Sequence, residues 1–289
     1  MAIAVLGMHR SGTSMVTRML AACGLRVGPA HELLAATSEN PTGYWERRPM
    51  VLLNDGVLDM LGLAWDHMPA VPPAGWERDA QLEPAVAEAR SIIASFPSDE
   101  LWGWKDPRTS VTLPLWERAM DDARADVVLC VRNPLDVAAS LAKRGGTSAR
   151  LAFELWHAYS ESALALARDR RHVVTHYDAH FEDARGELVR ICASVGLTPT
   201  EGELATAATG AVSEHRHAHS GLAALVRSGA RDETVALYLE LLHASGPVMA
   251  RVAGRDEMVV ASDGAETIDR ADTAAFIHEF RVEQGLTPA

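Results

Sequence analysis

Short apolar runs alternate with longer amphipathic or alanine-rich stretches between residues 2 and 197. The apolar runs predict four buried strands, at residues 2–7, 101–106, 125–132 and 172–178. The stretches between them predict helices, from about Ser11 to Cys23 and at residues 46–62, 81–95, 114–123, 134–144, 149–168 and 182–195. Such alternation is typical of a largely parallel sheet with helices on both faces. We therefore expect an α/β three-layer sandwich that binds its ligand at the carboxyl ends of the strands.

From about residue 201 onward the pattern is mainly helical, with one edge strand expected at 257–261. We expect a single domain, residues 1–289, with a core over about 1–200 and a helical extension over about 201–289. The proline-rich segment 70–79 is predicted to form a loop over the site. No apolar run approaches the roughly 18–20 residues that span a bilayer. Because the N-terminus also lacks a signal-peptide pattern, we expect a cytoplasmic protein without a membrane span.

Charge and cysteine content narrow the possible partners. The formal net charge of −12 argues against general nucleic-acid binding, which depends on a basic surface. A small anion could still bind, because a few fixed cations and helix N-termini are enough to hold one. The three cysteines are far apart in the sequence and form no C-x-x-C pair, so we expect buried free thiols rather than a zinc or redox site.

The segment GMHRSGTS, residues 7–14, follows the first apolar run and has the outline of a phosphate-binding loop. Gly7 and Gly12 have the spacing of the nucleotide-binding motif G-x-x-x-x-G-K-[ST], but Thr13 replaces its lysine and the nearest cation is Arg10. The glycines let backbone amides point inward, and the following helix adds its positive end. These features predict an anion site.

A kinase or ATPase needs the missing lysine and a carboxylate at a strand end that holds magnesium. The third predicted strand ends instead at Arg132, and the one acid after the second strand, Asp106, lies between Lys105 and Arg108. Cations therefore stand where metal ligands would be expected, and we predict a site that works without a metal. A P-loop kinase that uses ATP and magnesium is kept as an alternative, as is a non-catalytic nucleotide-binding protein.

The segment CVRNPLDVAASL, residues 130–141, predicts a second anion site. Arg132 ends the strand, Asn133 can cap the following helix, and Ser140 lies two turns further on. The alternative is a capped helix in which Arg132 pairs only with Asp136. Two anion sites at adjacent strand ends suit a nucleoside that carries phosphate groups at its 5′ and 3′ positions.

Together, GMHRSGTS and VRNPLDVAAS resemble the sulfotransferases that use 3′-phosphoadenosine 5′-phosphosulfate (PAPS), in particular a bacterial branch with N-P-x-G-Y-W-E and K-D-P-R segments. The resemblance covers about residues 2–197, including Tyr177 and Asp178 of the family's third motif, and implies a P-loop-like fold. It implies PAPS as donor, adenosine 3′,5′-bisphosphate as product, and no metal. It assigns donor binding to His9, Arg10, Ser11, Gly12, Thr13, Ser14, Arg132, Ser140, Tyr177 and, on a late basic loop, Arg216.

The resemblance also implies catalytic roles. Arg10 neutralises the leaving group and Lys105 contacts the transferring sulfuryl group. Glu46, expected in the first turn of a helix, is the leading general base, although it could serve only to stabilise that helix. His67 and His9 are the rival bases, since histidine has a suitable pKa.

The acceptor is expected to be a hydroxyl of a small molecule or specialised metabolite. Its candidate binding residues are Trp45, Trp65, Asp106 and Arg108. The segment SEHRHAHSG, residues 213–221, carries three alternating histidines, which would not share one helix face, so no metal site is expected there. The sequence leaves the oligomeric state open, with a homodimer as one alternative.

Overall fold

The computed structural model describes residues 2–38, 40–97, 100–211, 216, 219–253 and 269–286. Four parallel strands form one sheet in the order β2-β1-β3-β4. Their bounds are β1 Ala2–Leu6, β2 Trp102–Lys105, β3 Asp126–Val131 and β4 His172–His176. All four predicted strands are confirmed, each slightly shorter than expected. The predicted edge strand at 257–261 lies outside the described residues.

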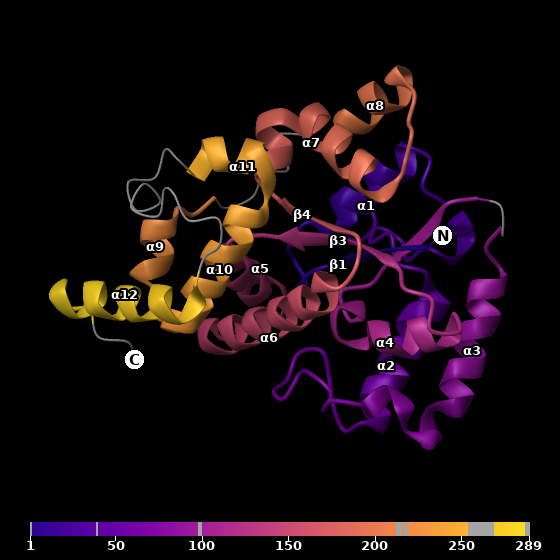
Figure 1. The fold of residues 1–289 in the computed structure, drawn as a ribbon, viewed down its shortest axis with the longest axis horizontal. Coiled ribbons are helices and arrows are strands. Elements are labelled where there is room, and N and C mark those ends of the chain that lie inside the picture. The colour runs from indigo at the N-terminus through magenta and orange to yellow at the C-terminus, as the bar shows by residue number, and fades with distance from the viewer. Residues whose placement is uncertain are drawn as a thin grey trace.

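Helices cover both faces of this sheet (Figure 1). They are α1 Thr13–Ala22, α2 Arg48–Met60, α3 Glu83–Ala94, α4 Thr109–Ala119, α5 Pro134–Gly145, α6 Ala149–Arg168, α7 Ala179–Val195, α8 Glu201–Ala208, α9 Leu222–Val226, α10 Asp232–Ala244, α11 Gly246–Ala253 and α12 Arg270–Glu283. In Figure 1, α1 and α7 lie above the strands, and α4 and α6 lie below them. This arrangement confirms the α/β three-layer sandwich. No helix in the described ranges is both long and apolar enough to cross a bilayer.

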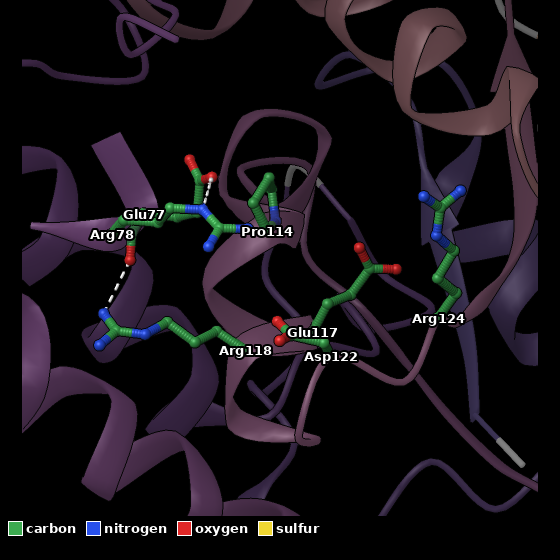
Figure 2. Close-up of a pocket in the computed structure, with 7 residues that line it drawn as sticks. All are labelled: Glu77, Arg78, Pro114, Glu117, Arg118, Asp122 and Arg124. Carbon is green, nitrogen blue, oxygen red and sulfur yellow. Dashed lines mark hydrogen bonds and ion pairs between the residues drawn. The ribbon is translucent and has the colours of Figure 1, made fainter. Parts of the chain in front are cut away.

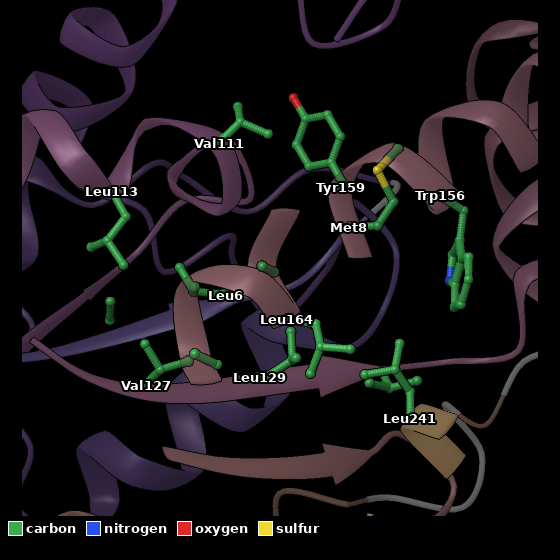
Figure 3. Close-up of a cluster of buried hydrophobic side chains, with 14 of the residues drawn as sticks. Leu6, Met8, Val111, Leu113, Val127, Leu129, Trp156, Tyr159, Leu164 and Leu241 are labelled. Atoms are coloured by element: carbon green, nitrogen blue, oxygen red, sulfur yellow. The ribbon is translucent and has the colours of Figure 1, made fainter. Parts of the chain in front are cut away.

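Alternating strand residues build two separate apolar layers. Ile3 and Val5 of β1 join α1, α7 and α8 in one cluster, whereas Ala4 and Leu6 join the helices of the opposite face. Figure 3 shows the second cluster, in which Leu6 and the β3 side chains lie beside Leu164 of α6. Because β1 and β3 are covered on both faces, their sequences are nearly continuous apolar runs.

Two helices, α4 and α7, start earlier in the chain than predicted. The helix predicted at 114–123 begins five residues earlier, at Thr109, with Pro114 inside it. The proline cannot donate to the carbonyl of Ser110, and Ser162 Oγ donates to that carbonyl instead, at 2.8 Å. Helix α7 begins at Ala179 rather than 182, with non-helical angles at Asp183.

Glu46 precedes its helix instead of lying in the first turn. Helix α2 begins at Arg48, because Arg47 is extended and Pro49 occupies the start of the helix. The proline-rich segment 70–79 also differs from the prediction: Trp76 is buried in the apolar core, and no residue of 70–79 lines the large pocket described below. The expectation of a loop over the site was wrong.

Candidate functional site

A pocket of about 700 Å³ opens at the carboxyl ends of the strands. Its walls come from the loop between β1 and α1, the segment 38–46, one face of α5, and single residues that follow β2, β3 and β4. The location agrees with the expectation for a parallel sheet. Residues 9, 10, 12, 13 and 14 of the first predicted motif line this pocket.

Close packing explains the glycines of the first loop. Gly7 and Gly12 both have positive φ, at 137° and 86°. A Cβ on Gly7 would clash with the carbonyl oxygen of Cys130, and a Cβ on Gly12 would clash with the Tyr177 ring. Gly12 is the N-cap of α1, so the positive end of this helix faces the pocket. Ser11 is buried behind the loop and does not line the pocket.

The two motifs contact each other directly. Arg10 Nε donates to Ser140 Oγ at 2.8 Å, although 130 residues separate them in the chain. Arg132 is buried at the end of β3, donates to the Arg10 carbonyl at 3.2 Å, and has its guanidinium 4.4 Å from the centre of the Tyr177 ring. The two segments predicted to bind anions are therefore in direct contact.

The start of α5 has the capping that the sequence suggests. Asn133 Oδ1 accepts from the backbone amide of Leu135 at 2.9 Å. The buried carboxylate of Asp136 accepts from the backbone amide and the hydroxyl of Ser220, at 3.1 and 2.6 Å. Asp136 thus fixes the late segment at Ser220 to the rim of the pocket.

Glu46 and Lys105 form a buried ion pair at the centre of the pocket wall. Lys105 Nζ also donates to Ser14 Oγ and to the Tyr44 carbonyl, both at 3.1 Å. Burial raises the pKa of the Glu46 carboxyl above its ordinary value, although the Lys105 charge opposes the rise. Since Glu46 contacts Lys105 and lies outside α2, it does not act as the cap of that helix.

Asp106 and Arg108 lie outside this pocket, within a buried polar network. Asp106 Oδ1 accepts from Arg108, and Asp106 Oδ2 accepts from Asn54 Nδ2 at 2.8 Å. Asn54 Oδ1 in turn accepts from Thr112 and Trp116, at 2.7 and 2.9 Å. Asp106 and Arg108 therefore fix the turn after Lys105 and do not line the pocket, and their contact with the acceptor stays a prediction.

The two tryptophans predicted to bind the acceptor occupy different positions relative to the pocket. Trp45 has a positive φ of 59°, donates from its ring nitrogen to the Thr42 carbonyl at 3.0 Å, and does not line the pocket. Trp65 supports His9, since their ring centres are 4.3 Å apart. Trp65 therefore packs behind His9, which lines the pocket, whereas Trp45 has no such position.

The histidine candidates have very different surroundings. The His67 side chain is 75% exposed, bonds to Asp66 and does not line the pocket. His9 is buried, lines the pocket, and has its pKa lowered well below the ordinary value by burial and by nearby cations. The structure therefore places His9, but not His67, in the wall of the pocket.

Arg216 is held away from the pocket by acids. It donates to Asp178 and to Glu182, each at 3.2 Å, and it is not among the pocket-lining residues. His219 Nδ1 lies 3.1 Å from the same Asp178 carboxylate. The other two histidines of this segment, His215 and His217, fall outside the described residues. The contact of Arg216 with the donor stays a prediction.

Sequence reasoning missed several pocket residues. Lys143 and Arg144 line it together with Asp136 and Ser140, at positions i, i+4, i+7 and i+8 of α5. This spacing marks one helix face, and it could have been extended from Ser140. Arg18, one turn beyond Ser14 on α1, could have been found by the same rule. Asn40, which donates to the Gly43 carbonyl at 2.7 Å, begins the N-P-x-G-Y-W-E segment and could have been found from it.

A second cavity of about 430 Å³ lies against α4 (Figure 2). Charged side chains of both signs line it, and Arg118 donates to the Glu77 carbonyl at 2.8 Å. None of the residues predicted for the site from the sequence lines this cavity. It is therefore separate from the pocket at the strand ends.

Sulfotransferases are among the proteins to which this chain is similar. One similar solved structure is sulfotransferase STF9 from Mycobacterium avium, with 18% identity and a TM-score of 0.45 over 89% of this chain and 76% of the other. Another is the sulfotransferase domain of the Synechococcus PCC 7002 olefin synthase, with 17% identity and a TM-score of 0.41 over 97% of this chain and 94% of the other. A third is retinol dehydratase in complex with androsterone and the inactive cofactor PAP, with 16% identity and a TM-score of 0.38 over 74% of this chain and 64% of the other. The search among curated proteins found no significant match. A family model described as "Sulfotransferase family" matches residues 2–201, and the chain therefore belongs to the sulfotransferase family.

Proposed function

We propose that the protein transfers the sulfuryl group of PAPS to a hydroxyl group of a small-molecule acceptor. Membership of the sulfotransferase family supports the class of reaction. The observation that carries the choice of donor is the direct contact between the two anion-binding segments, from Arg10 Nε to Ser140 Oγ and from Arg132 to the Arg10 carbonyl. A donor with phosphate groups at its 5′ and 3′ positions matches two anion sites that share one surface.

The residues present fit such a donor. The N-terminus of α1 opens on the pocket, and Arg10, Thr13 and Ser14 of the same loop line it. The loop of residues 7–14 would hold the 5′ end, and Arg132 with Ser140 would hold the 3′-phosphate. When bound, PAPS supplies the sulfuryl group and leaves as adenosine 3′,5′-bisphosphate.

Glu46 is the proposed general base, which takes the proton of the acceptor hydroxyl at a carboxylate oxygen. Its raised pKa makes it a better proton acceptor near neutral pH than an ordinary carboxylate. Lys105 bonds both to this base and to Ser14 of the donor loop, so it keeps the acceptor and the donor positioned relative to each other. Lys105 and Arg10 also place positive charge where negative charge spreads during transfer.

Calorimetric titration with adenosine 3′,5′-bisphosphate, in magnesium and in EDTA, tests the donor. We expect micromolar affinity that does not depend on magnesium. Thermal stabilisation by ATP with magnesium, and none by the bisphosphate, would contradict the proposal and favour a kinase. Sulfuryl transfer itself is followed by release of the bisphosphate from PAPS across a panel of hydroxyl compounds.

A further inference from the structure

The pocket carries more positive charge than the proposed donor contacts use. Among its described lining residues, six are Arg or Lys and two are Asp or Glu, in a chain whose net charge is −12. Arg10, Lys105 and Arg132 are assigned to the donor. Arg144 and Lys143 lie about one turn beyond Ser140 on the same α5 face. The fold therefore concentrates the excess of positive charge at one rim of the pocket.

His9 provides a second, independent feature of that rim. It is 6% exposed and lines the pocket, yet its Nε2 has no hydrogen-bond partner within the described ranges. The Trp65 ring lies on one side at 4.3 Å, and the Tyr159 ring approaches edge-on at 6.2 Å. Buried polar atoms in proteins are almost always paired, so this nitrogen marks a position for a ligand atom.

Trp65 connects His9 to Arg144. The Arg144 guanidinium carbon is 5.5 Å from the centre of the Trp65 ring, the same indole that stacks on His9. The other arginine near this indole, Arg108, does not line the pocket, whereas Arg144 does. Arg144 is therefore the guanidinium at the rim that is positioned to meet a ligand together with His9.

We propose that His9, Trp65 and Arg144 form a subsite for an anionic group of the acceptor, so that the acceptor is a hydroxy compound carrying a carboxylate or a phosphate monoester. This inference rests on the proposed sulfuryl transfer and names the acceptor class. The His9 Nε2–H and the Arg144 guanidinium donate to the anion, and Trp65, which lies behind them, holds the imidazole and the guanidinium in place. The acceptor hydroxyl then faces Glu46 in the same pocket.

The electrostatics of His9 support this reading. Burial is the largest cause of its lowered pKa, followed by the charges of Arg108, Lys105, Arg144 and Arg10. The imidazole is therefore neutral at pH 7 and can donate one hydrogen bond. An anion bound beside it would oppose those four cations and raise the pKa of His9.

Three probes with one ring and one hydroxyl test the subsite: 4-hydroxybenzoate, 4-hydroxyphenyl phosphate and the neutral methyl 4-hydroxybenzoate. Each is titrated calorimetrically into protein saturated with adenosine 3′,5′-bisphosphate. We expect at least one anionic probe to bind about tenfold or more tightly than the ester, since a charged hydrogen bond contributes about that factor. The better anionic probe distinguishes a carboxylate from a phosphate.

Arg144→Gln should abolish this preference, and His9→Phe should weaken binding of the anionic probe while His9→Asn partly restores it. The matched control is Arg150→Gln on α6, an 88% exposed arginine paired with Glu154, which should leave the preference intact. NMR of the His9 ring should show its pKa rising when the anionic probe, but not the ester, is bound.

Equal affinity for the three probes, including no measurable binding of any, overturns the subsite. So does a loss of bisphosphate affinity in Arg144→Gln as large as that in Arg132→Ala, because Arg144 would then belong to the donor site. Failure of the wild-type protein to bind the bisphosphate would instead contradict the proposed function itself. The two failures are therefore distinguishable.

Discussion

Lys105 contacts three separate parts of the proposed active site. Its ammonium group reaches Ser14 on the donor loop, the Tyr44 carbonyl, and the Glu46 carboxylate, which lie 91, 61 and 59 residues away in the chain. All of these contacts are short-range and buried or partly buried, where charge interactions are strong. Small displacements of β2 would therefore change the donor loop and the general base together.

Glu46→Gln should lower turnover by about 10²- to 10⁴-fold, since it removes a general base. The amide keeps a contact to Lys105, so affinity for adenosine 3′,5′-bisphosphate should change little. The wild-type rate should also rise with pH through the raised pKa of Glu46, because the carboxyl is a base only when deprotonated. Rate profiles against pH test this: a Glu46→Gln variant that retains the acidic limb would exclude Glu46 as the base.

Arg132→Ala should mostly weaken the binding of the nucleotide. The loss of a buried charged donor predicts about 10- to 100-fold weaker binding of adenosine 3′,5′-bisphosphate. Calorimetry measures this affinity, with the exposed Arg150→Gln as the control. Unchanged affinity in Arg132→Ala would disprove the assignment of the 3′-phosphate to this residue.

At the scale of elements, α2 lines no part of the pocket but supports it through the side chain of Asn54. Its amide group joins α2 to Asp106, which follows β2, and to Thr112 and Trp116 of α4. All four residues are buried. The orientation of the turn after Lys105 is therefore set by a helix that is remote in the sequence.

Asn54→Leu should destabilise the fold by about 2–4 kcal/mol, because it leaves several buried polar groups without a partner. Urea unfolding followed by circular dichroism gives the change in the free energy of unfolding. The exposed Asp59→Ala on the same helix is the control and should stay within about 0.5 kcal/mol of wild type. A similarly small change for Asn54→Leu would show that the network contributes little.

Elements with strong local patterns could be predicted from the sequence, and those determined by distant contacts could not. The strands are apolar on both faces, so their positions were clear. The start of α4 was misplaced because Pro114 resembles a helix start, and its tolerance depends on Ser162 of another helix. Gly7, Gly12, Arg10 and Arg132 were found by motif spacing. The pairing of Glu46 with Lys105, and the roles of Asn54 and Arg144, depend on packing between elements that local patterns do not encode.

At the scale of the whole molecule, two fully buried histidines couple stability to pH. Burial is the largest cause that lowers the pKa of His176 and of His180, each to about 4. Both rings are hydrogen-bonded, to Tyr238 and to Thr175. A histidine with a depressed pKa in the folded state binds fewer protons than in the unfolded state, whose pKa is about 6.5.

The free energy of unfolding should therefore be unaffected by these groups above about pH 6.5 and fall as the pH drops towards 4, by up to about 1.4 kcal/mol per pH unit for each histidine. Denaturant unfolding at several pH values measures the slope. His180→Gln should reduce it, and the exposed His172→Gln should not. An equal slope in His180→Gln would show that other groups control the acid sensitivity.

The strand order β2-β1-β3-β4 has a consequence for how the chain is made. Of the four described strands, β1 is synthesised first and is paired with both β2 and β3, which follow later in the chain. At typical translation rates about 5–20 seconds pass before β2 follows. During that interval Ala2–Leu6 has neither of its partner strands, so this sheet begins to form only after the chain as far as β2 has been made.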